Sequence, residues 1–134
     1  MFNSVVSVLL RSPFHRLVSK SMDLVRYTGR RTGRRIATPT QYAKRGEDVV
    51  ILVGRPEGKT WWHNFESDCN VDVLMKGRWN KMTARAVIGR DEPETIRSLL
   101  EVYAARFPKA LPAAGSSARD VQIGRSVIVL CRPR

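Results

Sequence analysis

The chain has 134 residues, of which 43% are hydrophobic and 27% are charged, a composition that excludes a disordered or a fibrous protein. Its 24 Lys and Arg residues outnumber 12 Asp and Glu residues and give a formal net charge of +12. The two cysteines, Cys69 and Cys131, lack the number and spacing of a disulfide scaffold or a zinc module. We therefore expect one domain over residues 1–134, in the reducing cytoplasm and without a metal site.

The first 23 residues predict a basic amphipathic helical segment. Asn3 and Ser12 are candidate helix caps, and an apolar stripe at helical spacing follows them, formed by Phe14, Leu17, Val18 and Met22. The longest apolar run there is too short to cross a bilayer. Residues 1–35 hold eight Lys or Arg and one acid, which indicates an anionic partner: a nucleic acid, an anionic membrane surface or a polyanionic small molecule. Peripheral contact with the inner face of the cell membrane therefore stays open.

From residue 24 onward the pattern predicts strands that are mostly connected as hairpins. The expected strands cover residues 24–28, 35–43, 49–53, 71–75, 81–88 and 126–131. A helical turn is expected at 61–67, and Asp91 with Glu94 predicts a capping box that opens one long helix ending near Arg106. The segment 107–120, rich in Pro, Ala, Gly and Ser, is expected to be a loop. Together these elements predict an α+β fold, a barrel-like roll of six or seven strands.

The strongest local signal is the basic turn at residues 28–35. Its glycines, Gly29 and Gly33, permit positive φ angles and expose successive backbone N–H groups, which suits an anion. Arginines around the turn, at positions 30, 31, 34 and 35, add planar charged donors for phosphate or carboxylate. The glycine spacing is neither that of a Walker loop nor that of a dinucleotide fingerprint. The alternative is a hairpin tip whose charges only face water.

A second candidate site follows the buried strand 49–53. Arg55 and Lys59 lie in a glycine-containing loop, and the aromatic run 61–65 comes directly after it. Cations beside flat aromatic rings suit a ligand that is planar at one end and anionic at the other. The alternative is one core tryptophan and one half-exposed tryptophan. No Ser–His–Asp order and no paired carboxylates stand out, so in an enzyme a bound cofactor would carry the chemistry.

The order of these segments resembles the deazaflavin-dependent nitroreductase family, split β-barrel flavin and deazaflavin oxidoreductases of actinobacterial type. Three stretches carry the resemblance: residues 28–33 with Thr38 and Pro39 beyond them, the strand 50–55, and residues 61–65 leading to 71–73. The resemblance implies an FMN-binding split-barrel-like fold and the cofactor F420, with FMN as the alternative. It also implies hydride transfer between the deazaflavin ring and a planar conjugated acceptor, either a quinone, an enone or a nitro compound.

Transferred position by position, the resemblance implies a set of cofactor-binding residues and identifies no catalytic residue. Contacts to the phosphate or tail are implied for Arg30, Arg31 and Thr32. Contacts to the ring and its linker are implied for Ala37, Thr38, Pro39, Thr40, Leu52, Val53, Gly54 and Arg55, with Thr60, Trp61, Trp62, His63 and Asn64 closing over them. The competing hypothesis is a non-catalytic basic β-barrel that binds single-stranded nucleic acid or an anionic membrane surface. Against nucleic acid, no strand alternates aromatic with basic residues.

Overall fold

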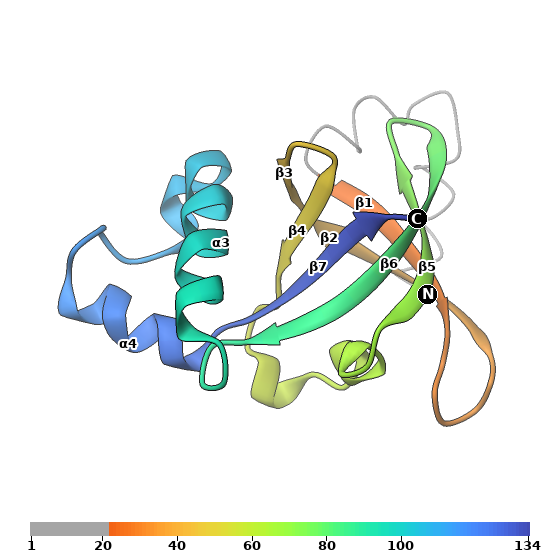
Figure 1. Ribbon diagram of the computed structural model, residues 1–134, viewed down its shortest axis with the longest axis horizontal. Coiled ribbons are helices and arrows are strands. Elements are labelled where there is room, and N and C mark those ends of the chain that lie inside the picture. Colours follow the sequence, from red (N-terminus) through yellow and green to blue (C-terminus); the bar gives the residue numbers. More distant parts are fainter. Residues whose placement is uncertain (1–21) are drawn as a thin grey trace.

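The computed structural model describes residues 22–134 (Figure 1), so the helices expected before residue 22 lie outside the described part. Within this part the chain forms seven strands: β1 (Met22–Thr28), β2 (Arg35–Gln41), β3 (Ala43–Arg45), β4 (Asp48–Leu52), β5 (Cys69–Met75), β6 (Arg78–Ile88) and β7 (Val127–Pro133). Two α-helices, α3 (Pro93–Arg106) and α4 (Ser117–Arg125), accompany the 3₁₀ helices η1 (Pro56–Gly58), η2 (Trp61–Phe65) and η3 (Pro108–Ala110).

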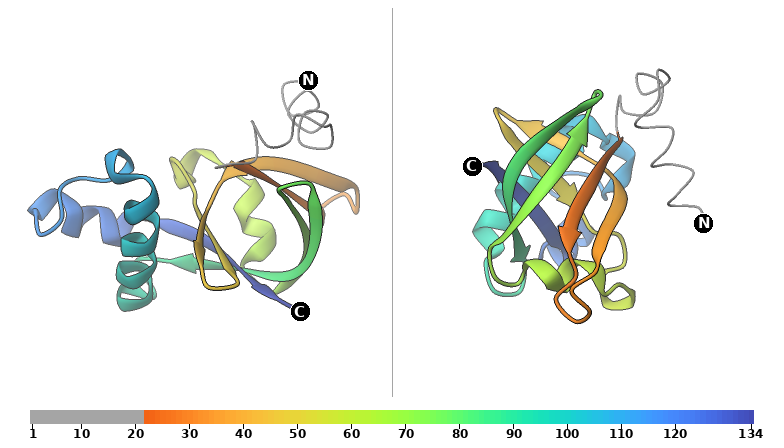
Figure 2. Two further views of the ribbon diagram at one scale, coloured as in Figure 1. Left: turned by 90° about the horizontal axis from the view of Figure 1, so that it is seen from above. Right: turned by 90° about the vertical axis from the view of Figure 1, so that its right-hand side faces the viewer.

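All seven strands join one antiparallel sheet in the order β2-β1-β5-β6-β7-β4-β3. The sheet curls until β2 approaches β4 across the barrel, and the two helices lie together on one side of it (Figure 2). Pro39 lies in β2, an edge strand, where its missing N–H costs no ladder hydrogen bond. The expected split-barrel α+β class is confirmed, and each expected strand from residue 24 onward is present with shifted ends.

Two apolar cores lie on the two faces of the sheet, and β4 contributes to both. Val49 and Ile51 point into the barrel, whereas Val50 is buried against α3 on the outer face. Because alternate residues of a strand face opposite sides, a strand buried on both faces is apolar throughout. This explains the continuous run of branched residues at 49–53.

The helical region departs from expectation in two places. The predicted Asp91–Glu94 capping box is wrong, because α3 starts at Pro93, has Glu92 as its N-cap and lacks a side-chain cap; the Glu92 carboxylate instead accepts a bond from Arg85 at 2.7 Å. The predicted loop 107–120 is also wrong from residue 117 on, where α4 begins.

The start of α4 is fixed by three polar contacts that involve Arg119. The Ser116 hydroxyl accepts the backbone N–H of Arg119 at 3.1 Å, an N-cap that offsets an otherwise weak helix signal. The buried Arg119 guanidinium donates to Glu101 of α3 at 3.1 Å and to the Pro112 carbonyl at 2.6 Å. Ion pairs to α3, of Arg119 with Glu101 at 3.1 Å and of Asp120 with Arg97 at 3.9 Å, therefore help to hold a helix in which Ile123 is the only buried apolar residue.

The barrel interior contains one fully buried carboxyl group. Asp23 of β1 faces Thr40 across the β1–β2 ladder, and the Thr40 hydroxyl donates to its Oδ1. Its Oδ2 has no hydrogen-bond partner among the described residues. Because burial disfavours the ionised form, the pKa of Asp23 rises from an ordinary 3.8 to about 7. The folded protein therefore binds this proton more tightly than the unfolded chain does.

Replacement of Asp23 by Asn should stabilise the protein at high pH. In the wild type the free energy of unfolding should fall between about pH 4 and about pH 7, by up to about 1.4 kcal/mol for each pH unit, because the unfolded chain releases the proton first. Asp23→Asn should lose this slope and exceed the wild type in stability at pH 8. Urea unfolding at pH 4 to 8 measures both, and a wild-type slope retained by the variant would contradict the assignment.

Candidate functional site

A cavity of about 340 Å³ lies between the arginine turn (residues 29–34) and η2. Its lining comes from β1, the turn, β2 and the start of η2: Tyr27, Gly29, Arg30, Arg31, Thr32, Ile36, Thr38, Thr60, Trp61 and Asn64. The turn is the loop at the lower right of Figure 1, and η2 lies at the same end of the barrel. The two segments that the sequence marked as separate candidates therefore enclose one space.

The arginine turn is closed by its own backbone. The Gly29 N–H donates to the Arg34 carbonyl at 2.8 Å, and the Gly33 N–H donates to the Gly29 carbonyl at 2.9 Å. Gly33 has a φ of +70°, a conformation that favours glycine. The backbone N–H groups of Arg31 and Thr32 have no acceptor within residues 22–134. Two consecutive free N–H groups beside guanidinium groups make a favourable position for an anion.

Gly29 serves the turn in a different way than the sequence suggested. Its φ is not in the left-handed region, so the expectation of positive φ at both glycines is wrong here. A Cβ at Gly29 would instead lie 2.9 Å from Cδ1 of Ile36. The absence of a side chain at Gly29 therefore leaves room for the Ile36 side chain, which lines the cavity.

Asn64 joins the turn to η2. Its Oδ1 accepts the backbone N–H of Arg30 at 2.7 Å, and its Nδ2 donates to the Trp61 carbonyl at 2.7 Å. Both ends of the amide are therefore engaged by the protein. This arrangement makes Asn64 a support for the cavity walls as well as part of their lining.

The inner wall of the cavity is aromatic. The Tyr27 ring packs edge-on against Phe65 with 5.1 Å between centroids, and Trp61 packs edge-on against Phe65 at 5.9 Å. The Tyr27 hydroxyl lies 3.2 Å from Oγ1 of Thr38. Burial raises the pKa of Tyr27, so its hydroxyl stays protonated at neutral pH. Among the described lining residues there is no carboxylate and no histidine.

The structure brings only part of the expected site together. Arg30, Arg31, Thr32, Thr38, Thr60, Trp61 and Asn64 line the cavity. Ala37 packs on the opposite face of β2 against the Leu24–Leu74 cluster, and Thr40 is bonded to Asp23 farther along the strand. Pro39 is paired with Leu24 and shares the face of Ala37.

The residues at the end of β4 lie outside this cavity. Leu52 packs toward α3 and Val53 packs inside the barrel. The Gly54 carbonyl accepts Nζ of Lys59 at 2.7 Å. Arg55 has a left-handed φ of +50° at the start of η1. These four residues therefore do not line the cavity beside the arginine turn, and the structure does not bring them together with it.

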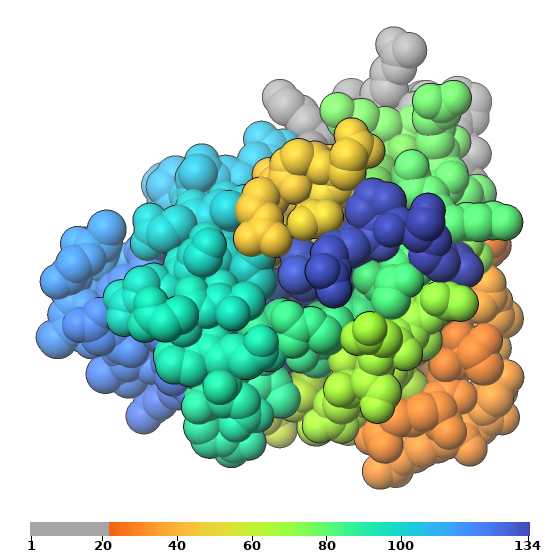
Figure 3. Space-filling view, in the orientation of Figure 1, coloured from red at the N-terminus to blue at the C-terminus, as the bar shows by residue number. Residues whose placement is uncertain are grey.

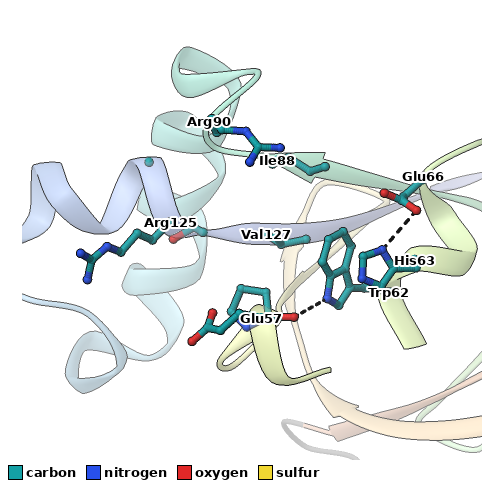
Figure 4. Close-up of a pocket in the computed structure, with 11 residues that line it drawn as sticks. Glu57, Trp62, His63, Glu66, Ile88, Arg90, Arg125 and Val127 are labelled. Atoms are coloured by element: carbon teal, nitrogen blue, oxygen red, sulfur yellow. Dashed lines mark hydrogen bonds and ion pairs between the residues drawn. The ribbon is translucent and has the colours of Figure 1, made fainter. Parts of the chain in front are cut away.

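Trp62 and His63 line a different hollow, of about 610 Å³, between η2, α4 and the ends of β6 and β7. Figure 4 shows their stacked rings, with the indole Nε1 donating to the Pro56 carbonyl and His63 beside Glu66. Trp62 is buried and Trp61 is half-buried. The adjacent tryptophans therefore serve separate spaces, and η2 is the wall between them.

Sequence reasoning missed two lining residues, Tyr27 and Ile36, and named Gly29 only as a glycine of the basic turn. Inward alternation along β1 identifies Tyr27, since Val25 and Tyr27 point to the same face. The β1–β2 register then pairs Tyr27 with Ile36. These signals become readable only once the register of the hairpin is known.

The F420H2-dependent quinone reductase family model matches residues 13–110, most of the chain and the whole of the cavity. The chain belongs to this family. It is therefore an F420-dependent oxidoreductase that reduces a small-molecule acceptor, and not a non-catalytic binding barrel. No curated protein matches the chain.

Solved structures agree on the fold of this F420H2-dependent quinone reductase family member. An F420-H2 dependent reductase superposes with a TM-score of 0.63 at 14% identity, over 84% of this chain and 95% of that one. A chain described as a domain-swapped dimer gives 0.59 at 12% identity, over 94% and 98%. A Listeria innocua protein described as a pyridoxamine 5'-phosphate oxidase gives 0.51 at 10% identity, over 100% and 94%.

Replacement of Asn64 by Ala should loosen the arginine turn. Loss of the bonds to Arg30 and Trp61 should cost about 1–3 kcal/mol of stability and expose the Arg30 amide. Hydrogen exchange of that amide should accelerate in Asn64→Ala. Asn80→Ala is a matched control, because Asn80 also donates to backbone carbonyls, of Val73 and Arg78, but at the other end of the barrel. Equal Arg30 exchange in both variants would contradict the proposed support.

Proposed function

We propose that this chain binds F420 in the cavity between the arginine turn and η2 and transfers a hydride between it and a planar conjugated acceptor. The acceptor is a quinone, an enone or a nitro compound. The observation that carries the proposal is the pairing, in one 340 Å³ cavity, of an anion-binding turn with an aromatic wall. F420 has the same two halves, a planar deazaflavin ring and an anionic tail.

The residues present suit both halves of the cofactor. The free N–H groups of Arg31 and Thr32 and the side chains of Arg30 and Arg31 favour phosphate and carboxylate groups. Trp61, Tyr27 and Ile36 provide flat apolar contact for a ring. When bound, F420 supplies the hydride, so the lining needs no acid–base pair of its own.

The roles we propose for the protein are binding, orientation and exclusion of water. The arginine turn holds the tail, and the Trp61 wall fixes the ring so that one face meets the acceptor. Asn64, which is bonded to both Arg30 and Trp61, holds the arginine turn and the Trp61 wall in fixed positions relative to each other. Ala37, Pro39, Thr40 and the β4 end support the strands from outside the cavity rather than touch the cofactor.

Membrane contact by residues 1–23 stays a prediction, since this segment falls almost wholly outside the described residues. Within residues 22–134, no helix is long and apolar enough to cross a membrane.

Replacement of Arg30 and Arg31 by Ala should weaken F420 binding about tenfold or more for each lost charge-assisted contact. Binding is measured by quenching of tryptophan fluorescence, with Trp61→Phe identifying the indole that reports. Arg125→Ala removes one cation from the other hollow and serves as control. Unchanged affinity in the double variant would show that the turn is only a solvated hairpin tip.

The salt dependence of binding should distinguish F420 from a polyanion such as a nucleic acid. F420 offers a few charges to a defined cavity, so its affinity should survive physiological salt. Affinity for single-stranded oligonucleotides should fall about a thousandfold or more between low and moderate salt if six or more phosphates are engaged. Parallel titrations measure both, and salt-resistant oligonucleotide binding without F420 binding would overturn the proposal.

A further inference from the structure

The positive charge of the described chain is concentrated at two opposite ends of the barrel. One end is the arginine turn, whose positive charge we have assigned to binding of the anionic F420 tail. The other end, which we call the basic mouth, has six cations and one acid around it: Lys44, Lys76, Arg78, Lys81, Arg106, Arg134 and Glu47. Nothing in the proposed reaction uses this second concentration of charge.

The basic mouth is hollowed. Three depressions of about 320, 560 and 210 Å³ adjoin one another there, with Lys44 in the lining of all three. In Figure 3 the β3–β4 hairpin and the β5–β6 hairpin lie at the upper end of the described part, and the end of β7 lies below them. The cations that line these depressions therefore come from separate elements.

Three of these six cations are not neutralised by the part of the chain that the structure describes. The side chains of Lys76, Arg78 and Lys81 are exposed and have no hydrogen bond or ion pair to another residue within 22–134. Lys76 has a φ of +50° and Gly77 a φ of +78°, so a tight turn projects the two flanking cations into solvent. Arg134 differs, because Asp72 lies 3.4 Å from its guanidinium.

Apolar and aromatic side chains line the same hollows. Tyr42, Met75 and Val102 contribute to the walls. Trp79 stands at the rim with 38% of its surface exposed, and the Arg26 guanidinium lies 3.9 Å from its ring centroid. An exposed indole among cations is typical of the boundary between water and lipid headgroups.

We propose that the basic mouth is a docking surface for an anionic lipid bilayer. Cations spread over separate elements match an array of headgroups better than they match one small anion, which would need donors that converge. Binding of single-stranded nucleic acid by stacking requires several aromatic rings in a row. Among the described residues, Trp79 is the one exposed tryptophan at this surface, which argues against nucleic acid.

The positions of the start of β1 and of the cofactor cavity are consistent with a bilayer at the basic mouth. β1 begins at Met22, which pairs with Gln41 beside the basic mouth, so the basic sequence before residue 22 joins the barrel at this end. The cofactor cavity lies at the other end, so an anionic tail would stay away from negatively charged lipid. The proposal does not depend on the reductase activity, since it rests on a separate surface.

Vesicle binding by the full chain, without cofactor, tests the proposal. Co-sedimentation should occur with phosphatidylcholine vesicles that contain phosphatidylglycerol, not with phosphatidylcholine alone, and should disappear at high salt. Lys76→Glu with Lys81→Glu should weaken it at least about 25-fold, taking about fivefold for each cation. Arg90→Glu with Arg125→Glu makes the same change in net charge elsewhere and should bind like the wild type. Trp79→Phe should lose the blue shift of fluorescence on vesicles.

Three results would overturn the proposal. Equal weakening by the two double variants would show that only net charge matters. Weakening by reversal of Arg11, Arg16 and Lys20 alone would assign binding to the N-terminal segment. Tighter binding of oligonucleotides than of vesicles, lost in the Lys76 and Lys81 variant, would assign the surface to nucleic acid. F420 affinity, which that variant should retain, is measured separately, so failure of the cofactor site would appear there and leave the vesicle result intact.

Discussion

The cavity depends on one hydrogen bond between segments that are far apart in the chain, from the backbone N–H of Arg30 to Oδ1 of Asn64 at 2.7 Å. The arginine turn projects from a two-stranded edge of the sheet, and η2 is a short 3₁₀ helix between two strands. The turn is closed by its own backbone bonds and η2 is anchored in the barrel core by Trp62 and Phe65, so each wall is held separately. The Asn64 amide joins them while the second end of the amide holds Trp61, so charge and aromatic surface face the same space.

The sheet was predictable because its strands carry strong local signals. Continuous apolar residues at 49–53 and the glycines between basic residues fix strands and turns without knowledge of their partners. The helix α4 was not predictable by the same means. It buries Ile123 alone among its apolar residues and depends on the pairing of Arg119 with Glu101. A contact with an element some twenty positions earlier leaves no periodic trace in the sequence.

The neighbourhood of the site was also predictable, but the direction of its side chains was not. The family resemblance implied cofactor contacts for contiguous stretches of residues. In a strand, however, alternate residues point to opposite faces. Thr38 therefore reaches the cavity while Ala37 and Pro39 do not. The same limit applies to Trp61 and Trp62, which are adjacent in sequence and lie in the walls of different hollows. The register of β2 and the rotation of η2 about its axis decide which of these side chains enters the cavity. Both depend on how the whole sheet curls.

The two glycines of the arginine turn differ in how their loss could be repaired. Gly33 is favoured by its own backbone angle, and no change elsewhere alters that preference. At position 29 a side chain would instead meet the terminal methyl of a neighbouring side chain, Ile36. A smaller residue at position 36 would make room for alanine at position 29. The effect of a substitution at position 29 should therefore depend on the residue at position 36, whereas the effect of one at position 33 should not, although the sequence shows glycine at both positions 29 and 33.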